Sequence, residues 1–290
     1  MENRINDRRS LLMFIGSMLI FGTIGIFRRF IPLPSAFIAL VRGLLGGLFL
    51  FAFVKLKRKS TGGPLSPRRF FGLVVTGAVM GFNWILLFEA YNHTTVAAAT
   101  LCYYMQPTIV LLLSPFLFGE KLTLKKAVCA AAAVIGMVLV SGVIGSGETQ
   151  SGDLKGIALG LGAALFYSFV VIMNKKLGGI NAYRKTIIQL VSAGTVMIPY
   201  LLLTGGFGSI TFDARTILLL LVVGIVHTGF AYALYFGCMD GLKAQTIALL
   251  SYIDPASALL FSAVLLREPL SLAGFIGAVM IIGSAIVSEI

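Results

Sequence analysis

The chain has 290 residues, of which 58% are hydrophobic and 12% are charged. Soluble proteins contain roughly 45 to 50% apolar and about 25% charged residues, so this composition excludes most soluble folds and disorder, and predicts a protein of the lipid bilayer. The formal net charge of +12 does not indicate a nucleic-acid partner, because the basic residues are confined to short segments between apolar runs.

Ten apolar segments are long enough to cross a bilayer, which requires about 20 residues. We expect each to be a helix, because in lipid only a helix satisfies its own backbone hydrogen bonds and because the segments are too long for barrel strands. The fold class is therefore all-α integral membrane. The expected spans, in chain order, are residues 11–31, 35–54, 70–91, 95–118, 125–144, 155–174, 182–204, 215–238, 244–266 and 270–288.

Lysine and arginine are distributed unevenly between the loops on the two sides of these spans. If both termini are cytoplasmic, the inside segments hold 17 of these residues and the outside segments hold five. Cytoplasmic loops retain positive residues, so we expect a multi-pass protein of the cell membrane with both termini in the cytoplasm. The pair Arg28 and Arg29 is discordant: it lies at a pore mouth, or it shows that the first span is tilted.

The second half of the chain repeats the first at an offset of 148 residues. The match aligns residue types that a biased membrane composition does not align by itself, including Gly81 with Gly229, Trp84 with Tyr232, Tyr104 with Tyr252, Pro107 with Pro255 and Glu120 with Glu268. Each half has five spans, and an odd number means that the second copy enters the membrane from the other side. Such inverted repeats give a transporter two related states, open to opposite sides.

This repeat divides the chain into four expected parts. They are a cytoplasmic N-terminal segment, a first five-helix repeat, an extracellular connecting loop and a second, inverted repeat, at residues 1–10, 11–144, 145–154 and 155–290.

The repeat lies in two stretches, GFNWILLFEAYNHTTVAAATLCYYMQPTIVLLLSPFLFGEKLTL and GFAYALYFGCMDGLKAQTIALLSYIDPASALLFSAVLLREPLSL. They resemble the ten-helix EamA-type carriers of the drug/metabolite transporter superfamily. The aromatic-Pro motif of the fourth and ninth spans and the following Gly-Glu-Lys-Leu and Arg-Glu-Pro-Leu turns are the most specific parts. The resemblance covers the whole chain and implies inverted five-helix repeats around a central substrate cavity. Many such relatives export amino acids or related metabolites, and a few import choline, nucleosides or other nutrients.

Polar side chains inside spans are candidates for the substrate path, because a charged one costs about 2.5 to 3.5 kcal/mol at a helix centre. Arg42 contacts a substrate carboxylate or pairs with backbone carbonyls. Gln189 is its polar counterpart in the seventh span. Asp254, with Ser251 and Ser257 on the same helix face, lines a cavity or bridges two helices. The repeat mate of Asp254 is Gln106, which also precedes a proline.

Asp254, His227 and Glu89 are the candidates for coupling transport to a proton. For His227 the alternative is a neutral ring that donates to a carbonyl, and for Glu89 a carboxylate that reaches the lipid headgroups. Pro107 and Pro255 are candidate hinges, because proline removes a backbone donor and kinks a helix.

Two pairs of aromatic residues occupy repeat-related positions, Trp84 with Tyr232 and Tyr104 with Tyr252. We expect these residues and Tyr167 either to line a cavity or to pack between helices. Together with Asn83 they complete the expected substrate-binding set. Glu120 and Glu268 are expected to be structural. Each precedes a turn into a new span, with Thr123 and Ser271 as N-caps, where an acidic group is favourable.

These features favour a secondary carrier for a small polar metabolite, most specifically the export of an amino acid or derivative, by alternating access. The alternative is uptake of an organic cation such as choline, which the aromatic residues with Asp254 suit. We expect a monomer with membrane lipid and a substrate as partners, and no nucleic acid, cofactor or metal. No GxxxxGK[ST], HExxH or GxSxG pattern occurs, so neither ATP hydrolysis by the chain nor an enzyme is expected.

Overall fold

The computed structural model describes residues 2–58, 62–94, 96–141, 153–207, 210, 212–267 and 271–289, and every regular element within them is a helix. Most of the expected connecting loop, and Glu268, lie outside these residues. The first repeat contains α1 (Glu2–Arg29), α2 (Ser35–Leu56), α3 (Pro67–His93), α4 (Val96–Tyr103), α5 (Gln106–Phe118) and α6 (Leu124–Ser141).

The second repeat begins with α7 (Asp153–Lys176) and α8 (Ala182–Leu203). It continues with α9 (Ala214–Val222), η1 (Val223–Phe230), α10 (Ala231–Cys238) and η2 (Met239–Gly241), and ends with α11 (Ala244–Ser251), α12 (Ile253–Leu265) and α13 (Leu272–Glu289). The expected N-terminal segment is helical from residue 2 and extends α1 beyond the predicted span.

Eight helical stretches of the described chain are long and apolar enough to cross a membrane, and they correspond to eight of the ten predicted spans. The remaining two are α6 and α13, which have 18 residues each. The all-α membrane fold is therefore confirmed, while the count of ten spans stays a prediction.

Two of the spans are interrupted at related positions. The fourth breaks between α4 and α5 at Tyr104 and Met105, and the ninth breaks between α11 and α12 at Tyr252. Pro107 and Pro255 lie in the first turns after these breaks. Proline is tolerated in a first helical turn, where its missing N–H leaves no bond unmade. The structure thus shows interrupted helices where the sequence predicts kinks.

The eighth span contains a π-helix, η1, between α9 and α10. Within it the Thr228 hydroxyl donates to the carbonyl of Val223, five residues earlier, at 2.9 Å. At the start of this span Asp213 caps α9, and hydrogen bonds with the side chain and backbone of Thr216 lower the pKa of its carboxyl.

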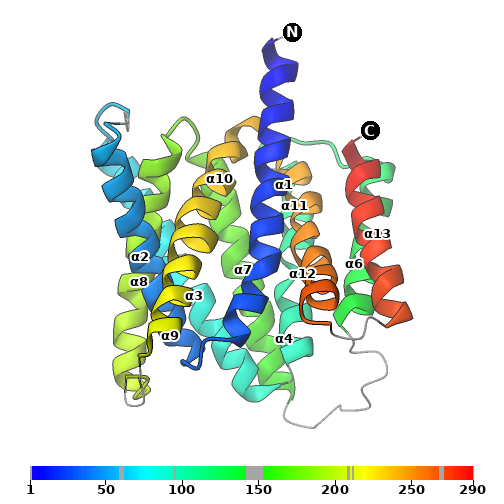
Figure 1. Ribbon diagram of the computed structural model, residues 1–290. Helices are drawn as coiled ribbons and strands as arrows, with labels where there is room; N and C mark the ends of the chain where they lie inside the picture. Colours follow the sequence, from blue (N-terminus) through cyan, green and yellow to red (C-terminus); the bar gives the residue numbers. More distant parts are fainter. Residues whose placement is uncertain are drawn as a thin grey trace.

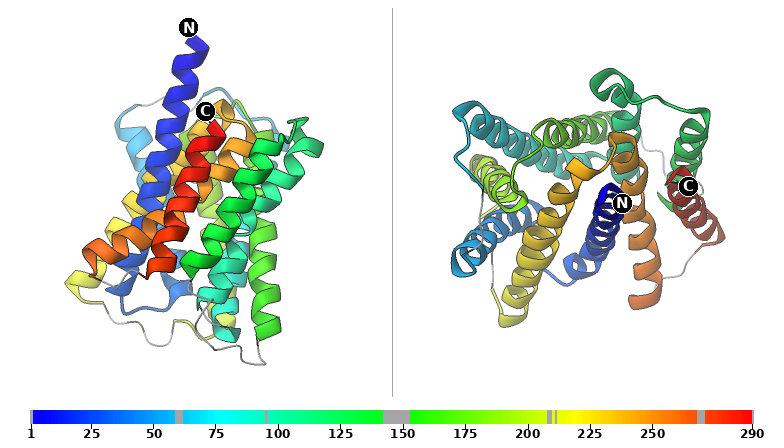
Figure 2. Two further views of the ribbon diagram at one scale, coloured as in Figure 1. Left: turned by 90° about the vertical axis from the view of Figure 1, so that its right-hand side faces the viewer. Right: turned by 90° about the horizontal axis from the view of Figure 1, so that it is seen from above.

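The two repeats are inverted with respect to each other. Both chain termini lie at one end of the bundle, which we call the terminal face, and the other end is the opposite face (Figure 1). Helix α1 runs away from the terminal face, whereas its equivalent α7 runs toward it (Figures 1 and 2). This is the arrangement that an odd number of spans per repeat requires.

Close glycine contacts follow the same two-fold relation. A Cβ on Gly81 of α3 would lie 2.7 Å from the carbonyl oxygen of Ala193 in α8. A Cβ on its repeat mate, Gly229 of η1, would lie 3.1 Å from the carbonyl oxygen of Gly46 in α2. Small residues let helices approach closely in lipid, where packing replaces the hydrophobic driving force. Equivalent helices therefore meet through equivalent small residues.

Candidate functional site

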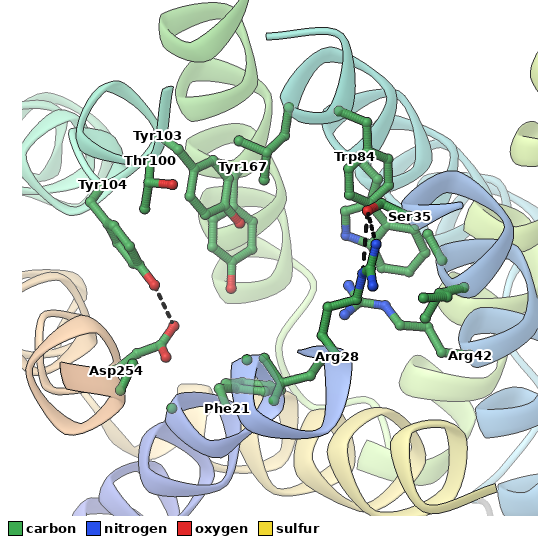
Figure 3. Close-up of a pocket in the computed structure, with 18 of the residues that line it drawn as sticks. Phe21, Arg28, Ser35, Arg42, Trp84, Thr100, Tyr103, Tyr104, Tyr167 and Asp254 are labelled. Atoms are coloured by element: carbon green, nitrogen blue, oxygen red, sulfur yellow. Dashed lines mark hydrogen bonds between the residues drawn. The ribbon is translucent and has the colours of Figure 1, made fainter. Parts of the chain in front are cut away.

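A cavity of about 370 Å³ lies between the two repeats. Its wall is formed by α1 to α5 of the first repeat and by α7, η1, α10, α11 and α12 of the second. Of the sequence candidates, it includes Arg42, Trp84, Tyr104, Gln106, Pro107, Tyr167, Tyr232 and Asp254. The structure thus brings residues from distant parts of the sequence to one hollow (Figure 3).

The cavity extends toward the opposite face. Its lining reaches Arg28 near the end of α1, Ser35 at the start of α2 and Tyr91 near the end of α3. Toward the terminal face the space between the repeats is filled by Phe14 and Tyr235, whose ring centroids are 5.3 Å apart and whose side chains are fully buried. The cavity therefore reaches toward the opposite face, and packed side chains separate it from the terminal face.

One wall of the cavity carries Asp254 in the first turn of α12. The Tyr104 hydroxyl donates to its carboxylate at 3.2 Å, so the two residues link the repeats (Figure 3). Beside them the rings of Tyr103 and Tyr167 stack with centroids 5.7 Å apart and planes at 9°. Asp254 therefore lines the cavity and bridges two helices, which combines the two alternatives that the sequence left open.

The facing wall carries two guanidinium groups. Arg42 lies over the Trp84 ring, 4.5 Å from its centroid, and its Nε is buried with no hydrogen-bond partner in the described chain. Arg28 donates to the Ser35 hydroxyl at 3.0 and 3.3 Å and to a backbone carbonyl at 2.9 Å (Figure 3). A third polar group on the lining, the amide nitrogen of Gln106, is also buried without a partner among the described residues.

Three of the proposed substrate contacts lie outside the cavity lining and have partners elsewhere. Asn83 donates to the carbonyl of Ala163 at 2.6 Å. Gln189 exchanges hydrogen bonds with Asn174 at 2.9 and 3.1 Å. The hydroxyl of Tyr252 is 2.6 Å from that of Thr108. These bonds place the three side chains between helices in this conformation.

Two of the proton-coupling candidates and one candidate hinge also lie away from the lining. His227 is 2.8 Å from the Thr23 hydroxyl and packs on the Phe27 ring. Glu89 accepts a hydrogen bond from the Tyr200 hydroxyl at 2.6 Å. Pro255 follows Asp254 without lining the hollow. Asp254 is thus the one coupling candidate that faces the cavity.

Some lining residues were not among the sequence candidates. They include Phe21, Ser35, Tyr91 and Thr100, which are of common types and carry no distinctive signal. Arg28 did carry one, because it broke the charge asymmetry of the loops. Its position at the end of the lining nearest the opposite face agrees with a pore mouth, one of the two explanations given for the discordant pair.

Glu120 is structural, as expected, and the helix that its carboxylate caps belongs to the other repeat. Its carboxylate accepts hydrogen bonds from the backbone N–H groups of Ala244 at 2.8 Å and Gln245 at 3.1 Å, at the start of α11 in the other repeat. Thr123 caps the helix that follows Glu120, as the sequence predicts, and accepts a hydrogen bond from the N–H of Lys126. Glu120 therefore joins the repeats at the terminal face.

The chain matches the model of the EamA-like transporter family twice, over residues 8–142 and 154–289. It therefore belongs to the EamA-like transporter family. Together with the apolar helices, this membership establishes a multi-pass membrane transporter of the drug/metabolite type, and not an enzyme.

Similar proteins agree with this assignment. An uncharacterized transporter, YxxF, of Bacillus subtilis is 30% identical over 88% of this chain and 81% of its own length. A probable amino-acid metabolite efflux pump of Escherichia coli is 30% identical over 75% of this chain and 74% of its own length. A solved crystal structure shares the fold, with a TM-score of 0.83 at 21% identity, and the match covers 97% of this chain and 98% of the other.

Proposed function

We propose that this transporter moves an amino acid or a close derivative out of the cytoplasm by alternating access. The observation that carries the proposal is the pairing of opposite charges on facing walls of one hollow, Asp254 on one side and Arg42 on the other. A zwitterion presents a carboxylate and an ammonium group together, and each meets a charge of opposite sign. The relative named as an amino-acid metabolite efflux pump supports the same class of substrate and the same direction.

The aromatic side chains of the lining complete the proposed site. Arg42, which lies over the Trp84 ring, offers a planar fork that matches a carboxylate. Tyr104, Tyr167 and Tyr232 supply apolar faces and hydroxyl groups to the lining, and an ammonium group is attracted to such faces by cation–π interaction. Gln106 offers a free amide donor. Pro107 and Pro255 follow the helix breaks and serve as hinges in this proposal.

The proposed direction depends on the sidedness of the membrane. We place both termini in the cytoplasm of a cell-membrane protein, because Lys and Arg gather in the segments of that side. The cavity then opens outward in this conformation, and an exporter releases substrate from such a state. The protein acts as a monomer, and Asp254, which faces the hollow, is the group that exchanges a coupling proton.

Uptake of an organic cation such as choline is the competing function. The aromatic lining with Asp254 suits a quaternary ammonium group. Two guanidinium groups in the same hollow oppose it, because a permanent cation gains nothing from Arg28 or Arg42 and is repelled by both.

Counterflow in lipid vesicles tests the proposal. Vesicles containing the purified protein are loaded with one unlabelled compound, and entry of the labelled form of the same compound is followed for a panel of amino acids and for choline. We expect accelerated exchange of at least one amino acid and none of choline. Exchange of choline without exchange of any amino acid contradicts the proposal, as does a protein inactive toward the whole amino-acid panel.

A further inference from the structure

The charges of the cavity do not balance. Its lining contains three side chains that carry a formal charge, the guanidinium groups of Arg28 and Arg42 and the carboxyl group of Asp254. No ion pair joins any of the three to another described residue. With Asp254 ionised the lining carries an excess of one positive charge, and with Asp254 protonated it carries an excess of two.

The excess persists at every physiological pH, because arginine stays protonated in proteins. Charges in a wall of low dielectric interact more strongly with a ligand than they do in water. A ligand that brings a matching negative charge therefore gains binding energy that a neutral zwitterion leaves unused. The cavity as a whole favours an anion.

Both guanidinium groups have donors available for a ligand. Arginine has five N–H donors, and three of those of Arg28 are used by Ser35 and by the carbonyl of Ile31, which leaves two. Arg42 has its Nε unpartnered in the described structure. Guanidinium groups bind carboxylates through two parallel hydrogen bonds, so each arginine suits one carboxylate. The bonds to Ser35 and the stacking on Trp84 hold the two groups in place before a ligand binds.

The three groups also lie in an order along the cavity. Arg28 is near the end of α1, at the mouth, whereas Arg42 lies one to two turns deeper along α2 from Ser35. Asp254 faces them from the other repeat (Figure 3). A ligand that uses all three groups spans the hollow from the two guanidinium groups to Asp254 (Figure 3).

We propose that the substrate is an acidic amino acid, with two carboxylates and one ammonium group. Its α-carboxylate binds Arg42, its side-chain carboxylate binds Arg28, and its ammonium group binds Asp254. Arg28 is then the residue that sets specificity between acidic and neutral amino acids. This inference rests on the proposed amino-acid function and names the substrate class within it. A volume of about 370 Å³ is near the lower end of small-molecule sites, which are roughly 300 to 1,000 Å³, and suits a ligand of this size.

Counterflow with matched pairs of compounds tests the inference on the unaltered protein. Glutamate is compared with glutamine and aspartate with asparagine, because each pair differs in charge and hardly in shape. Succinate, which lacks the amine, and choline complete the panel. We expect acidic amino acids to exchange at least about tenfold better than their amides, which corresponds to about 1.4 kcal/mol, and better than succinate.

Three other outcomes would each overturn a stated part of the proposal. Equal exchange of glutamate and glutamine overturns the acidic substrate and leaves the amino-acid carrier standing. Exchange of succinate as fast as glutamate overturns the role of the ammonium group. Exchange of choline alone overturns both this inference and the proposed function. The experiment therefore separates the failure of one from the failure of the other.

Variants test whether Arg28 sets the preference for acidic over neutral amino acids. In Arg28→Gln we expect the preference for glutamate over glutamine to fall by at least about tenfold. Arg29→Gln is the matched control, because Arg29 is the adjacent exposed residue and does not line the cavity; it should keep the preference of the unaltered protein. An Arg28→Gln protein with an unchanged preference contradicts the assignment. If this variant does not fold, the comparison on the unaltered protein still decides the substrate class.

Discussion

The hydrogen bond between Tyr104 and Asp254 is a direct polar link between the repeats at the cavity wall. Each residue sits beside a helix break, and each has its repeat mate at the corresponding break, Tyr252 and Gln106. The mates differ from this pair, since the Tyr252 hydroxyl bonds to that of Thr108 and the amide nitrogen of Gln106 has no partner among the described residues. The two halves therefore share a backbone plan but differ in the side chains that face the hollow. As a result, the negative charge of Asp254 lies on one wall and the positive charges of Arg28 and Arg42 lie on the facing wall (Figure 3).

Removing this bond should weaken substrate binding. In Tyr104→Phe the carboxylate of Asp254 loses its hydroxyl donor, and a hydrogen bond to a charged group contributes about 1.5 to 3 kcal/mol. We expect at least a tenfold loss of apparent affinity in ligand-induced thermal shifts. Tyr183→Phe, on the terminal side and outside the lining, is the control and should bind normally. Unchanged affinity in Tyr104→Phe would show that the bond has no part in binding.

The contact between Arg42 and Trp84 should also contribute to substrate binding. Arg42→Lys keeps the charge but loses the planar group that stacks on the ring and binds a carboxylate through two donors. We expect the substrate concentration for half-maximal counterflow to rise by roughly tenfold, with expression unchanged. A lysine variant that matches the unaltered protein would mean that Arg42 acts only as a point charge.

At the scale of elements, Glu120 closes the terminal face by capping a helix of the other repeat. Its carboxylate receives two backbone N–H groups of α11, and its carbonyl receives the side-chain amide of Gln245 at 3.3 Å. Lys175 of α7 donates to the carbonyl of Leu242 just before the same helix. The start of α11 is thus held by groups from both repeats while the cavity is open on the other side.

Loss of the Glu120 cap should loosen this face. In Glu120→Ala the first N–H groups of α11 lose their acceptor, and removal of a helix cap costs about 0.5 to 2 kcal/mol. We expect faster amide hydrogen exchange in the peptide that contains Ala244 and Gln245. Asp213→Ala removes the cap of α9 and is the matched control, since it should leave exchange in α11 unchanged. Protection of α11 that survives Glu120→Ala would contradict this role of the residue.

The close approach of α6 and α13 depends on glycine. A Cβ on Gly277 would lie 2.5 Å from the carbonyl oxygen of Gly136, so Gly277→Ala forces the helices apart, at a cost of about 1 to 3 kcal/mol. Gly283 lies in the same helix with open space around it, and Gly283→Ala is the control. We expect a lower unfolding temperature in detergent for the first variant alone. Equal unfolding temperatures would indicate that the helices adapt without strain.

For the molecule as a whole, the sequence predicts architecture better than it predicts the site. Hydropathy indicated the helices, and the offset of 148 residues indicated the inverted repeat, because both patterns follow from the bilayer and are local or periodic. The bonds of Gln189 with Asn174 and of Glu120 with α11 were not predictable, since they depend on which helices meet. The π-helix was not predicted either, because no residue pattern in the eighth span distinguishes it from an α-helix.

The residues expected to line the cavity also differ in how well the sequence predicts their position. Arg42 and Asp254 were predicted because charge inside a span is costly and therefore conspicuous. Asn83 and Tyr252 are polar at similar depths, but their helix faces turn toward neighbouring helices. The face that a residue of a span presents to the hollow is set by tertiary packing, so the polar character of a residue identified only part of the lining.

The proposed transport requires a cavity between the inverted repeats that opens to the side opposite the termini. The most direct test is labelling of Ser251→Cys, at the cavity wall, after replacement of Cys102, Cys129 and Cys238 by serine. A membrane-impermeant thiol reagent is applied to intact cells and to inside-out vesicles, with and without substrate. We predict rapid labelling from outside the cell that substrate slows. Labelling from the cytoplasmic side alone, or labelling that no substrate affects, would contradict the account.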